Sequence, residues 1–390
     1  MENNSDNFAM SQIREYKEVG FLGRLWILSC GFYLTQLLPI SPVHISFVIV
    51  FSFIFIGFLK ERKALVDRSF LLLSSISFVA LFLCFNSPAP IALNLIVSIL
   101  SFFIVGVLFK RRSIGAFFVL VVFFSYSLLF NIDALWRIIH PELYDLEKLE
   151  SLGVGFQVYK ANSFMYTDSN YVGIESLAFL SVFIYLFRNA ELNGYLFLFY
   201  VFVFLMLTLS LLLTFSRSAY FGCLLLFFVC SFMNGKRNAY LLLFFSPLIC
   251  WLSFEFVSEL LSNDVSFSSK FHIIELTFDY IERSSWFEFF FGVGLGNAVN
   301  AIGIGSHNIL ITFLIETGVV GFVFFVSINV FLMFKLKSDF LIIALPFMIS
   351  SLSLGSTAIP YYFSLVSICI LHRSGFLVVT GLNSSVVKNT

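Results

Sequence analysis

The chain has 390 residues, of which 59% are hydrophobic and 12% are charged, and its formal net charge at pH 7 is +0. A water-soluble domain of this length needs a more polar surface, so the composition excludes an ordinary soluble protein. Balanced charge also gives no global attraction to nucleic acid, which is therefore not an expected partner.

Long apolar runs recur along the chain and predict membrane-spanning helices. The run 195–233 has 39 residues with one charge, Arg217, which is the length of about two membrane crossings. The runs are continuous rather than alternating, which disfavours a barrel. We predict an all-α polytopic membrane protein, a single membrane domain over 1–390. About twelve spans are expected, near 23–40, 44–59, 69–85, 89–109, 114–131, 171–187, 195–213, 218–233, 238–255, 307–334, 339–354 and 358–371.

The basic residues predict the orientation of these spans. Lys and Arg precede the first span and follow every second span, whereas the short loops between, such as 86–90, have neither. Cytoplasmic loops carry this excess of positive charge. We therefore expect both termini in the cytoplasm. The long connections at about 131–170 and 256–306, and the short polar segment 214–218, then lie on the outer face.

The first span is expected to be a retained anchor, because no small-residue cleavage site follows it. All six cysteines lie within apolar runs, so neither a disulfide framework nor a Cys-x-x-Cys metal site is expected.

The stretch "TFSRSAYFG", 214–222, places Arg217 at the hinge of a helical hairpin. An arginine at membrane depth needs a partner or water. Its guanidinium either reaches lipid headgroups or binds phosphate oxygens through its planar fork. Ser216 and Ser218 add hydrogen-bond donors and suit the cap of the next helix.

The second outer loop contains "SSKFHIIELTFDYIERSSWFEFFFGVGLG", 268–296. Ser268 or Ser269 is expected to cap an amphipathic helix that runs to about Arg283, with Lys270 and His272 in its first turn. The apolar positions recur at three- and four-residue steps: Phe271, Ile274, Phe278 and Ile281. Such a helix lies on the membrane, where it either only anchors the loop or also presents Lys270 to a ligand.

Three glycines, Gly292, Gly294 and Gly296, follow this helix. No strand precedes them, so a dinucleotide-binding fold is not expected. Their freedom of backbone conformation instead lets the chain turn back towards the bilayer.

The next span opens with "SHNILITFLIETGVVG", 306–321. Ser306 is expected to cap it, with His307 in the first turn, where free N–H groups favour anions. His307 either exchanges a proton near neutral pH or is a lone interfacial histidine. Glu316 follows nine residues later, half a turn out of phase and roughly 13 Å deeper, so it does not share a ligand atom with His307. We expect Glu316 to hydrogen-bond a neighbouring helix, with Gly318 and Gly321 allowing close packing.

The stretch "KANSFMYTDSNYVGIES", 160–176, has a similar arrangement before the sixth span. Asp168, Ser169 and Asn170 are candidate caps, Glu175 lies just inside the span, and Lys160 is the nearest cation in the loop.

Together, "FSRSAYFG", the loop with Lys270 and "GVGLG", and "SHNILITFLIETGVVG" resemble the O-antigen polymerase and ligase superfamily of bacterial envelope glycosyltransferases. "TDSNY" is similar to the Asp-Pro-Asn segment of that family, and the resemblance covers about 160–325. In two places the chain departs from the family pattern. Lys270 stands where members usually carry arginine, and Ser169 stands in place of the proline. Arg283 and Gly294 have an Arg-x10-Gly spacing described for some polymerases.

The resemblance implies an enzyme that takes a sugar chain from undecaprenyl diphosphate on the outer face of the bacterial inner membrane and transfers it to an acceptor sugar. Arg217 and Lys270 would bind the diphosphate, together with Ser216 and Ser218. His307 would activate the acceptor hydroxyl or add a further diphosphate contact. The supporting residues would be Asn308, Glu316, Asn170, Glu175 and Arg283. The sequence has neither Asp-x-Asp nor His-Glu-x-x-His, so we expect no metal and no other cofactor.

Within the family we favour a polymerase that joins lipid-linked repeat units. The alternatives are a ligase that uses lipid A–core as acceptor and a capsule or exopolysaccharide polymerase. A transporter of lipid-linked sugars is disfavoured, because the polar groups gather at one face rather than at the midplane. The expected partners are lipid-linked glycans and membrane lipid, and the family adds a chain-length regulator.

Overall fold

The computed structural model describes residues 16–38, 40–60, 87, 89–142, 158–188, 190, 192, 194–234, 265–354 and 359–380. The expected spans at 69–85 and 238–255 lie outside these residues, as does the beginning of the second outer loop.

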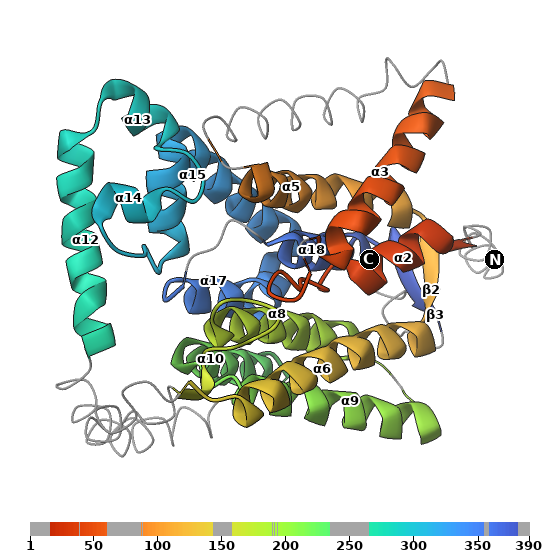
Figure 1. The fold of residues 1–390 in the computed structure, drawn as a ribbon. Helices are drawn as coiled ribbons and strands as arrows, with labels where there is room; N and C mark the ends of the chain where they lie inside the picture. The colour runs from red at the N-terminus through yellow and green to blue at the C-terminus, as the bar shows by residue number, and fades with distance from the viewer. Residues whose placement is uncertain are drawn as a thin grey trace.

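The described part is mostly helical, as the composition predicts (Figure 1). Six of its helices are long and apolar enough to cross a membrane. They are α3 (Pro42–Lys60), α5 (Ala89–Phe109), α6 (Ala116–Ile139), α8 (Ser169–Phe187), α9 (Gly194–Leu212) and α15 (Ile309–Leu336). The shorter helices α10 (Arg217–Asn234) and α18 (Pro360–Arg373) pack among them. A membrane-embedded helical protein is thus confirmed, whereas the count of about twelve spans is not.

α8 is the central helix of this bundle. Its most apolar stretch is 83% buried inside the protein, against 22% for α9, so α9 presents most of its surface outward. Phenylalanines fill the space around α8. Phe179 and Phe183, for example, contact Phe123 of α6 with ring centroids 5.9 and 5.2 Å apart. α8 therefore holds the other elements in place, including those that carry the candidate site.

The expected first span, 23–40, is wrong as a continuous helix. α2 (Phe21–Ser29) ends early, and the described residues 30–38 and 40–41 are irregular. Side chains replace helical hydrogen bonds there: Gly31 N–H donates to the Tyr126 hydroxyl at 2.9 Å, and Leu34 N–H to Ser41 Oγ at 2.9 Å. Apolar composition therefore does not fix the conformation of this segment, in which Leu37, Leu38 and Ile40 are exposed.

The expected span at 339–354 is also broken. A 3-10 helix, η3 (Lys337–Asp339), is followed by α16 (Phe340–Ile343) and α17 (Leu345–Ser351). Pro346 lies in the first turn of α17, where its missing N–H breaks no hydrogen bond, but it cannot continue the preceding helix. Apolar residues here form short pieces that pack against α8 and α10.

A small parallel sheet departs from the all-α expectation. β1 (Lys17–Glu18), β2 (Arg112–Gly115) and β3 (Leu377–Thr380) pair in the order β1–β2–β3. The sheet joins the N-terminal segment, the basic connection after α5 and the segment after α18 at one end of the bundle (Figure 1).

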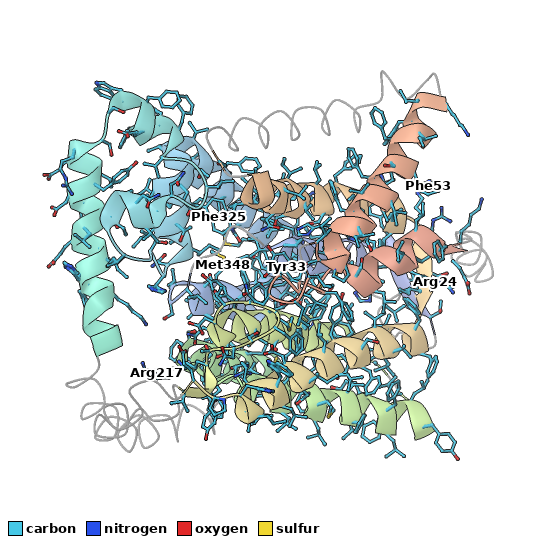
Figure 2. The ribbon with its side chains drawn as sticks, in the orientation of Figure 1. Arg24, Tyr33, Phe53, Arg217, Phe325 and Met348 are labelled. Carbon is cyan, nitrogen blue, oxygen red and sulfur yellow. The ribbon has the colours of Figure 1, made fainter. Side chains whose placement is uncertain are left out.

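The two ends of the bundle carry different elements. Near the sheet, Asp339 forms ion pairs with Arg188 and Arg373, so three expected cytoplasmic connections meet. The opposite end carries α12 (Val265–Arg283), α13 (Trp286–Phe291) and α14 (Ala298–Ile302), and Arg217 lies at that same edge (Figure 2).

Candidate functional site

Arg217 is the first residue of α10 and lies at the tip of the α9–α10 hairpin, as predicted. The turn requires a left-handed backbone at Phe215, with φ 53°. Thr214 and Ser216 are fully buried, whereas Arg217 is exposed. Ser216 Oγ accepts a hydrogen bond from Ala219 N–H at 3.4 Å and lies 3.2 Å from Ser218 Oγ, which confirms its place at the helix cap. The tip thus presents a cation above buried, ordered backbone.

Gly173 allows α8 to approach this tip closely. A Cβ at Gly173 would lie 3.0 Å from the Cβ atoms of Ser216 and Ala219, and 3.1 Å from Thr214 Oγ1. A side chain at this position would require its neighbours at the tip to move by a few tenths of an ångström.

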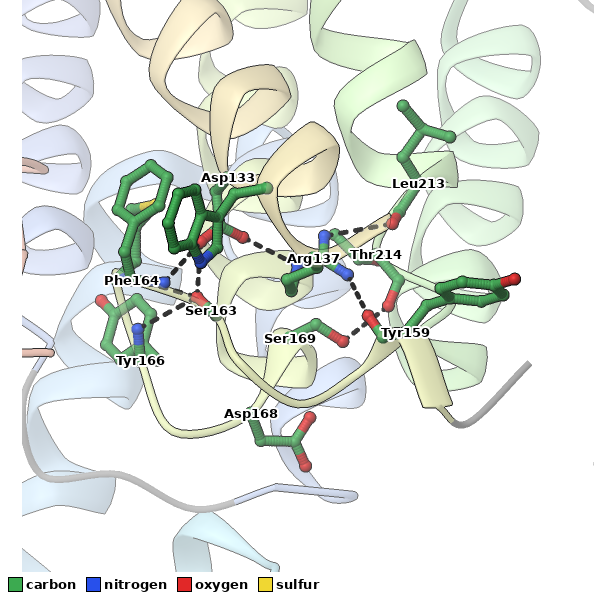
Figure 3. A network of polar contacts seen from close by, with 12 residues as sticks. Asp133, Arg137, Tyr159, Ser163, Phe164, Tyr166, Asp168, Ser169, Leu213 and Thr214 are labelled. Carbon is green, nitrogen blue, oxygen red and sulfur yellow. Dashed lines mark hydrogen bonds and ion pairs between the residues drawn. The ribbon is translucent and has the colours of Figure 1, made fainter. Parts of the chain in front are cut away.

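A buried polar network lies behind the tip (Figure 3). Arg137 Nε donates to Asp133 Oδ2 at 2.9 Å, and both side chains are 0% exposed. The other two guanidinium nitrogens donate to carbonyl oxygens of Tyr159, at 2.7 Å, and Leu213, at 3.1 Å. The pair therefore connects α6 to the loop before α8 and to the end of α9.

The loop before α8 is held by the same network. Asp133 Oδ1 accepts hydrogen bonds from Ser163 Oγ at 2.7 Å and from Phe164 N–H at 3.0 Å. Ser169 Oγ donates to the Thr214 carbonyl at 2.7 Å, which ties the loop directly to the hairpin tip.

Of the three candidate caps of α8, Asp168 is the one that acts. Its Oδ1 accepts from Asn170 N–H at 2.8 Å, and its Oδ2 from Asn170 Nδ2 at 3.0 Å. Asn170 therefore supports Asp168. Glu175 lies deeper and is fully buried, with Tyr166 OH donating to its Oε2 at 2.9 Å, so it braces the loop from within the bundle.

α12 ends at Arg283 as predicted but begins at Val265, so neither Ser268 nor Ser269 caps it. Lys270 consequently lies in the second turn, and its Nζ donates to Ser353 Oγ, beyond the end of α17, at 2.7 Å. Arg283 is exposed, and its Nε donates to the Asp279 carbonyl at 3.0 Å, within α12.

α12 has two apolar faces. Ile273 and Tyr280 pack against α14 and α15. Phe271 and Phe278 are exposed, with 59% and 64% of their surface accessible. A helix with a buried face and an exposed apolar face suits a position between protein and membrane surface.

α13 is fixed by a capping box between Ser285 and Glu288. Ser285 N–H and Oγ donate to Glu288 Oε2 at 2.9 and 2.8 Å. These hydrogen bonds hold the pKa of the Glu288 carboxyl below its usual value.

The three glycines after α13 turn the chain as expected, with φ of 77°, 94° and 78° at Gly292, Gly294 and Gly296. The turn returns the chain to α15, which is interrupted at Gly318 (φ 64°, ψ −170°). Val293 and Gly294 N–H groups donate to the carbonyls of Ile315 and Glu316, at 3.0 and 3.1 Å. The outer loop thus satisfies backbone groups that the helix break leaves open.

The expected cap of α15 is wrong by two residues. Asn308, and not Ser306, is the N-cap, and its Oδ1 accepts from the N–H groups of Leu310 and Ile311. His307 therefore precedes the helix and is not in its first turn. It is exposed, with φ 43°, and its ring lies over Gly305, where a Cβ would be 3.0 Å from Nε2.

Glu316 is buried, and the backbone amides of Gly296 and Ala298 lie close to its carboxylate. Its partner is therefore the turn before α14 rather than a neighbouring span. This contact explains a carboxylate inside the apolar run, because it fixes the outer loop to α15.

The structure places Arg217, Lys270 and His307 on three separate elements at one end of the molecule: α10, α12 and the connection into α15. The Asp133–Arg137 pair escaped the sequence analysis, because the expected span ended at 131 whereas α6 continues to Ile139. The opposite charges of Asp133 and Arg137, four residues apart, could have indicated an ion pair on a helix. No protein-family model matches the chain, and no characterised protein matches it.

Proposed function

We propose that this protein is a bacterial glycosyltransferase that polymerises undecaprenyl-diphosphate-linked repeat units at the outer face of the inner membrane. Arg217 carries the proposal. It is an exposed cation on a tip whose neighbours are buried and hydrogen-bonded, at the end of an apolar bundle. A guanidinium on a hydrogen-bonded tip suits a diphosphate, whose charge grows on the leaving oxygen as the sugar departs.

Two further side chains support this assignment. Lys270 lies on α12, the helix with an exposed apolar face, so a lipid-linked substrate at the membrane surface comes within its reach. His307 is exposed outside α15, where its imidazole is open to an acceptor hydroxyl. In this reaction the acceptor oxygen bonds to the anomeric carbon, the bond to the diphosphate breaks, and His307 takes the hydroxyl proton.

The experiment that tests the function is a gel of surface polysaccharide from a strain lacking the gene. Core bearing a single repeat unit, with the ladder lost, supports a polymerase. Bare core with polymer left on its lipid carrier supports a ligase, and loss of capsule or secreted polysaccharide alone moves the enzyme to that polymer. Unchanged glycans would refute the proposal.

Substitutions in the site should remove transfer from correctly inserted protein. Arg217→Ala removes the fork that holds the diphosphate, and His307→Ala removes the base. Each should lower polymer synthesis by about a hundredfold or more. The measurement is the glycan ladder in cells with matched protein levels. Lys337→Ala, an exposed cation at the opposite end, is the control and should leave the ladder intact. A normal ladder with Arg217→Ala would remove Arg217 from the site.

The proposed orientation has its own test. In a chain whose six cysteines are replaced, Asn300→Cys on α14 should react with a membrane-impermeant thiol reagent in intact spheroplasts. Lys337→Cys should react only after permeabilisation, because positive connections face the cytoplasm. Both side chains are exposed in the structure, so burial does not separate them. The reverse labelling pattern would place the candidate site in the cytoplasm.

A transporter of the same lipid-linked sugars is the second candidate, because the break in α15 at Gly318 is a feature of transporters. The carbonyls at this break are already bonded by Val293 and Gly294, which favours the enzyme. Substrate that accumulates facing the cytoplasm in the deletion strain would favour transport.

A further inference from the structure

The place of Arg217 depends on backbone held from outside its own hairpin. Arg217 follows Leu213 by four residues, and the Leu213 carbonyl accepts a hydrogen bond from Arg137 Nη2 at 3.1 Å. The next carbonyl, of Thr214, accepts from Ser169 Oγ at 2.7 Å. Two successive carbonyls of the tip are thus bound by side chains from other segments.

The same two charged residues hold the loop before α8 (Figure 3). Arg137 Nη1 donates to the Tyr159 carbonyl at 2.7 Å, and Asp133 Oδ1 accepts from Ser163 and Phe164. The loop, in turn, supplies the Ser169 hydroxyl that binds the tip. α6, the loop and the tip therefore form one closed set of contacts.

Stability alone does not explain this pair. Both side chains are 0% exposed, and a buried ion pair often contributes no more than well-packed apolar residues of similar size. An arginine differs in geometry, because its rigid fork binds three acceptors in fixed directions, which lysine cannot do. Here the three acceptors lie on three segments: Asp133, Tyr159 and Leu213.

We propose that Asp133 and Arg137 are positioning residues, which fix the Arg217 tip and the loop 158–169 relative to α6. The part that concerns substrate rests on the proposed function: a fixed tip presents Arg217 to an anionic group at one place. The part that concerns the tip does not depend on any activity.

The test is hydrogen–deuterium exchange of the full-length chain in detergent, read on peptides that cover 213–219. Arg137→Lys keeps the charge opposite Asp133 but loses the contacts to Tyr159 and Leu213. Asp133→Leu with Arg137→Met removes both charges and keeps the side-chain volume. Both variants should exchange about ten- to a hundredfold faster at the tip, because the hydrogen bonds that restrain it are lost. Arg188→Lys, at the Asp339 ion pair of the opposite end, is the matched control and should not change exchange at 213–219.

If exchange at 213–219 is unchanged in both variants, the proposal is overturned. Asp133 and Arg137 would then only neutralise each other's charge. If Arg137→Lys does not fold, the double variant decides. The second readout is the glycan ladder in cells that contain Arg137→Lys at the wild-type level, which should be strongly reduced. If exchange at the tip is faster but the glycan ladder is normal, the pair does not position Arg217 for the substrate, and that part of the proposal is overturned. If the wild-type strain and the strain lacking the gene have the same glycans, the proposed function is refuted. The exchange result would still decide whether the pair fixes the tip.

Discussion

Replacing Gly318 by alanine should prevent the protein from folding to its native form. A Cβ at Gly318 would lie 2.4 Å from the backbone C and O of Phe290 and 2.5 Å from Phe291 N. The backbone conformation, φ 64° and ψ −170°, is also one that residues with side chains avoid. The contact is reciprocal, because a Cβ at Gly292 would meet the backbone of Glu316 and Thr317 at 2.4 to 2.5 Å. Neither backbone can move without losing the bonds between the outer loop and α15.

Gly318→Ala should lower the free energy of unfolding by more than about 4 kcal/mol, because losses of this size arise from backbone strain and steric clashes in a core. The measurement is the yield of monodisperse protein in detergent and its melting temperature. Gly106→Ala in α5 is the matched control, because a Cβ there meets nothing within 4 Å and alanine favours a helix. A Gly318→Ala protein that melts with the wild type would show that α13 and α15 do not pack in this way.

Hydropathy predicted the helices that cross the bundle and could not predict their interruptions. The run 307–334 reads as one uniform apolar segment, yet α15 breaks at Gly318 because residues 292–298 supply hydrogen bonds from elsewhere in the chain. The same limit applies at 30–38, where the Tyr126 hydroxyl replaces a helical partner. A long-range partner leaves no trace in local composition.

Local signals were reliable where the partner is local. The end of α12 at Arg283 and the cap at Asp168 depend on residues a few positions away. At the N-terminus of α15, by contrast, the local sequence does not decide between two candidate caps. Ser306 and Asn308 both suit a cap, and Ser306 instead pairs its Oγ with Thr312 Oγ1 at 2.6 Å. His307 is placed outside the helix by that choice.

The candidate site combines both kinds of information. Its exposed cations were visible in the sequence because charge is rare in this chain. The buried group behind the Arg217 tip was not, because Arg137 looks like an ordinary helical residue until the loop 158–169 is seen folded against it. Hydrophobic periodicity does not distinguish such a supporting polar group within an apolar run.

Asp133→Leu should destabilise the protein by about 3 to 5 kcal/mol, because it leaves the buried Arg137 guanidinium without a counter-charge. Ser163 Oγ and Phe164 N–H lose their acceptor at the same time. Thermal unfolding in detergent should show a melting temperature several degrees lower than that of the wild type.

The double variant Asp133→Leu/Arg137→Met should recover most of that loss, because no buried charge remains. The comparison separates the two contributions of the pair: its charge decides whether the chain folds, and its fork decides where the tip lies. Glu18→Ala is the control, since the Glu18–Arg24 pair has side chains 82% and 48% exposed and should contribute less than about 1 kcal/mol. If Asp133→Leu alone melts with the wild type, water reaches Arg137 and the network is not the closed set of contacts described above. If the double variant is no more stable than the single one, the hydrogen bonds to Tyr159 and Leu213, and not the charge balance, dominate the free energy of unfolding.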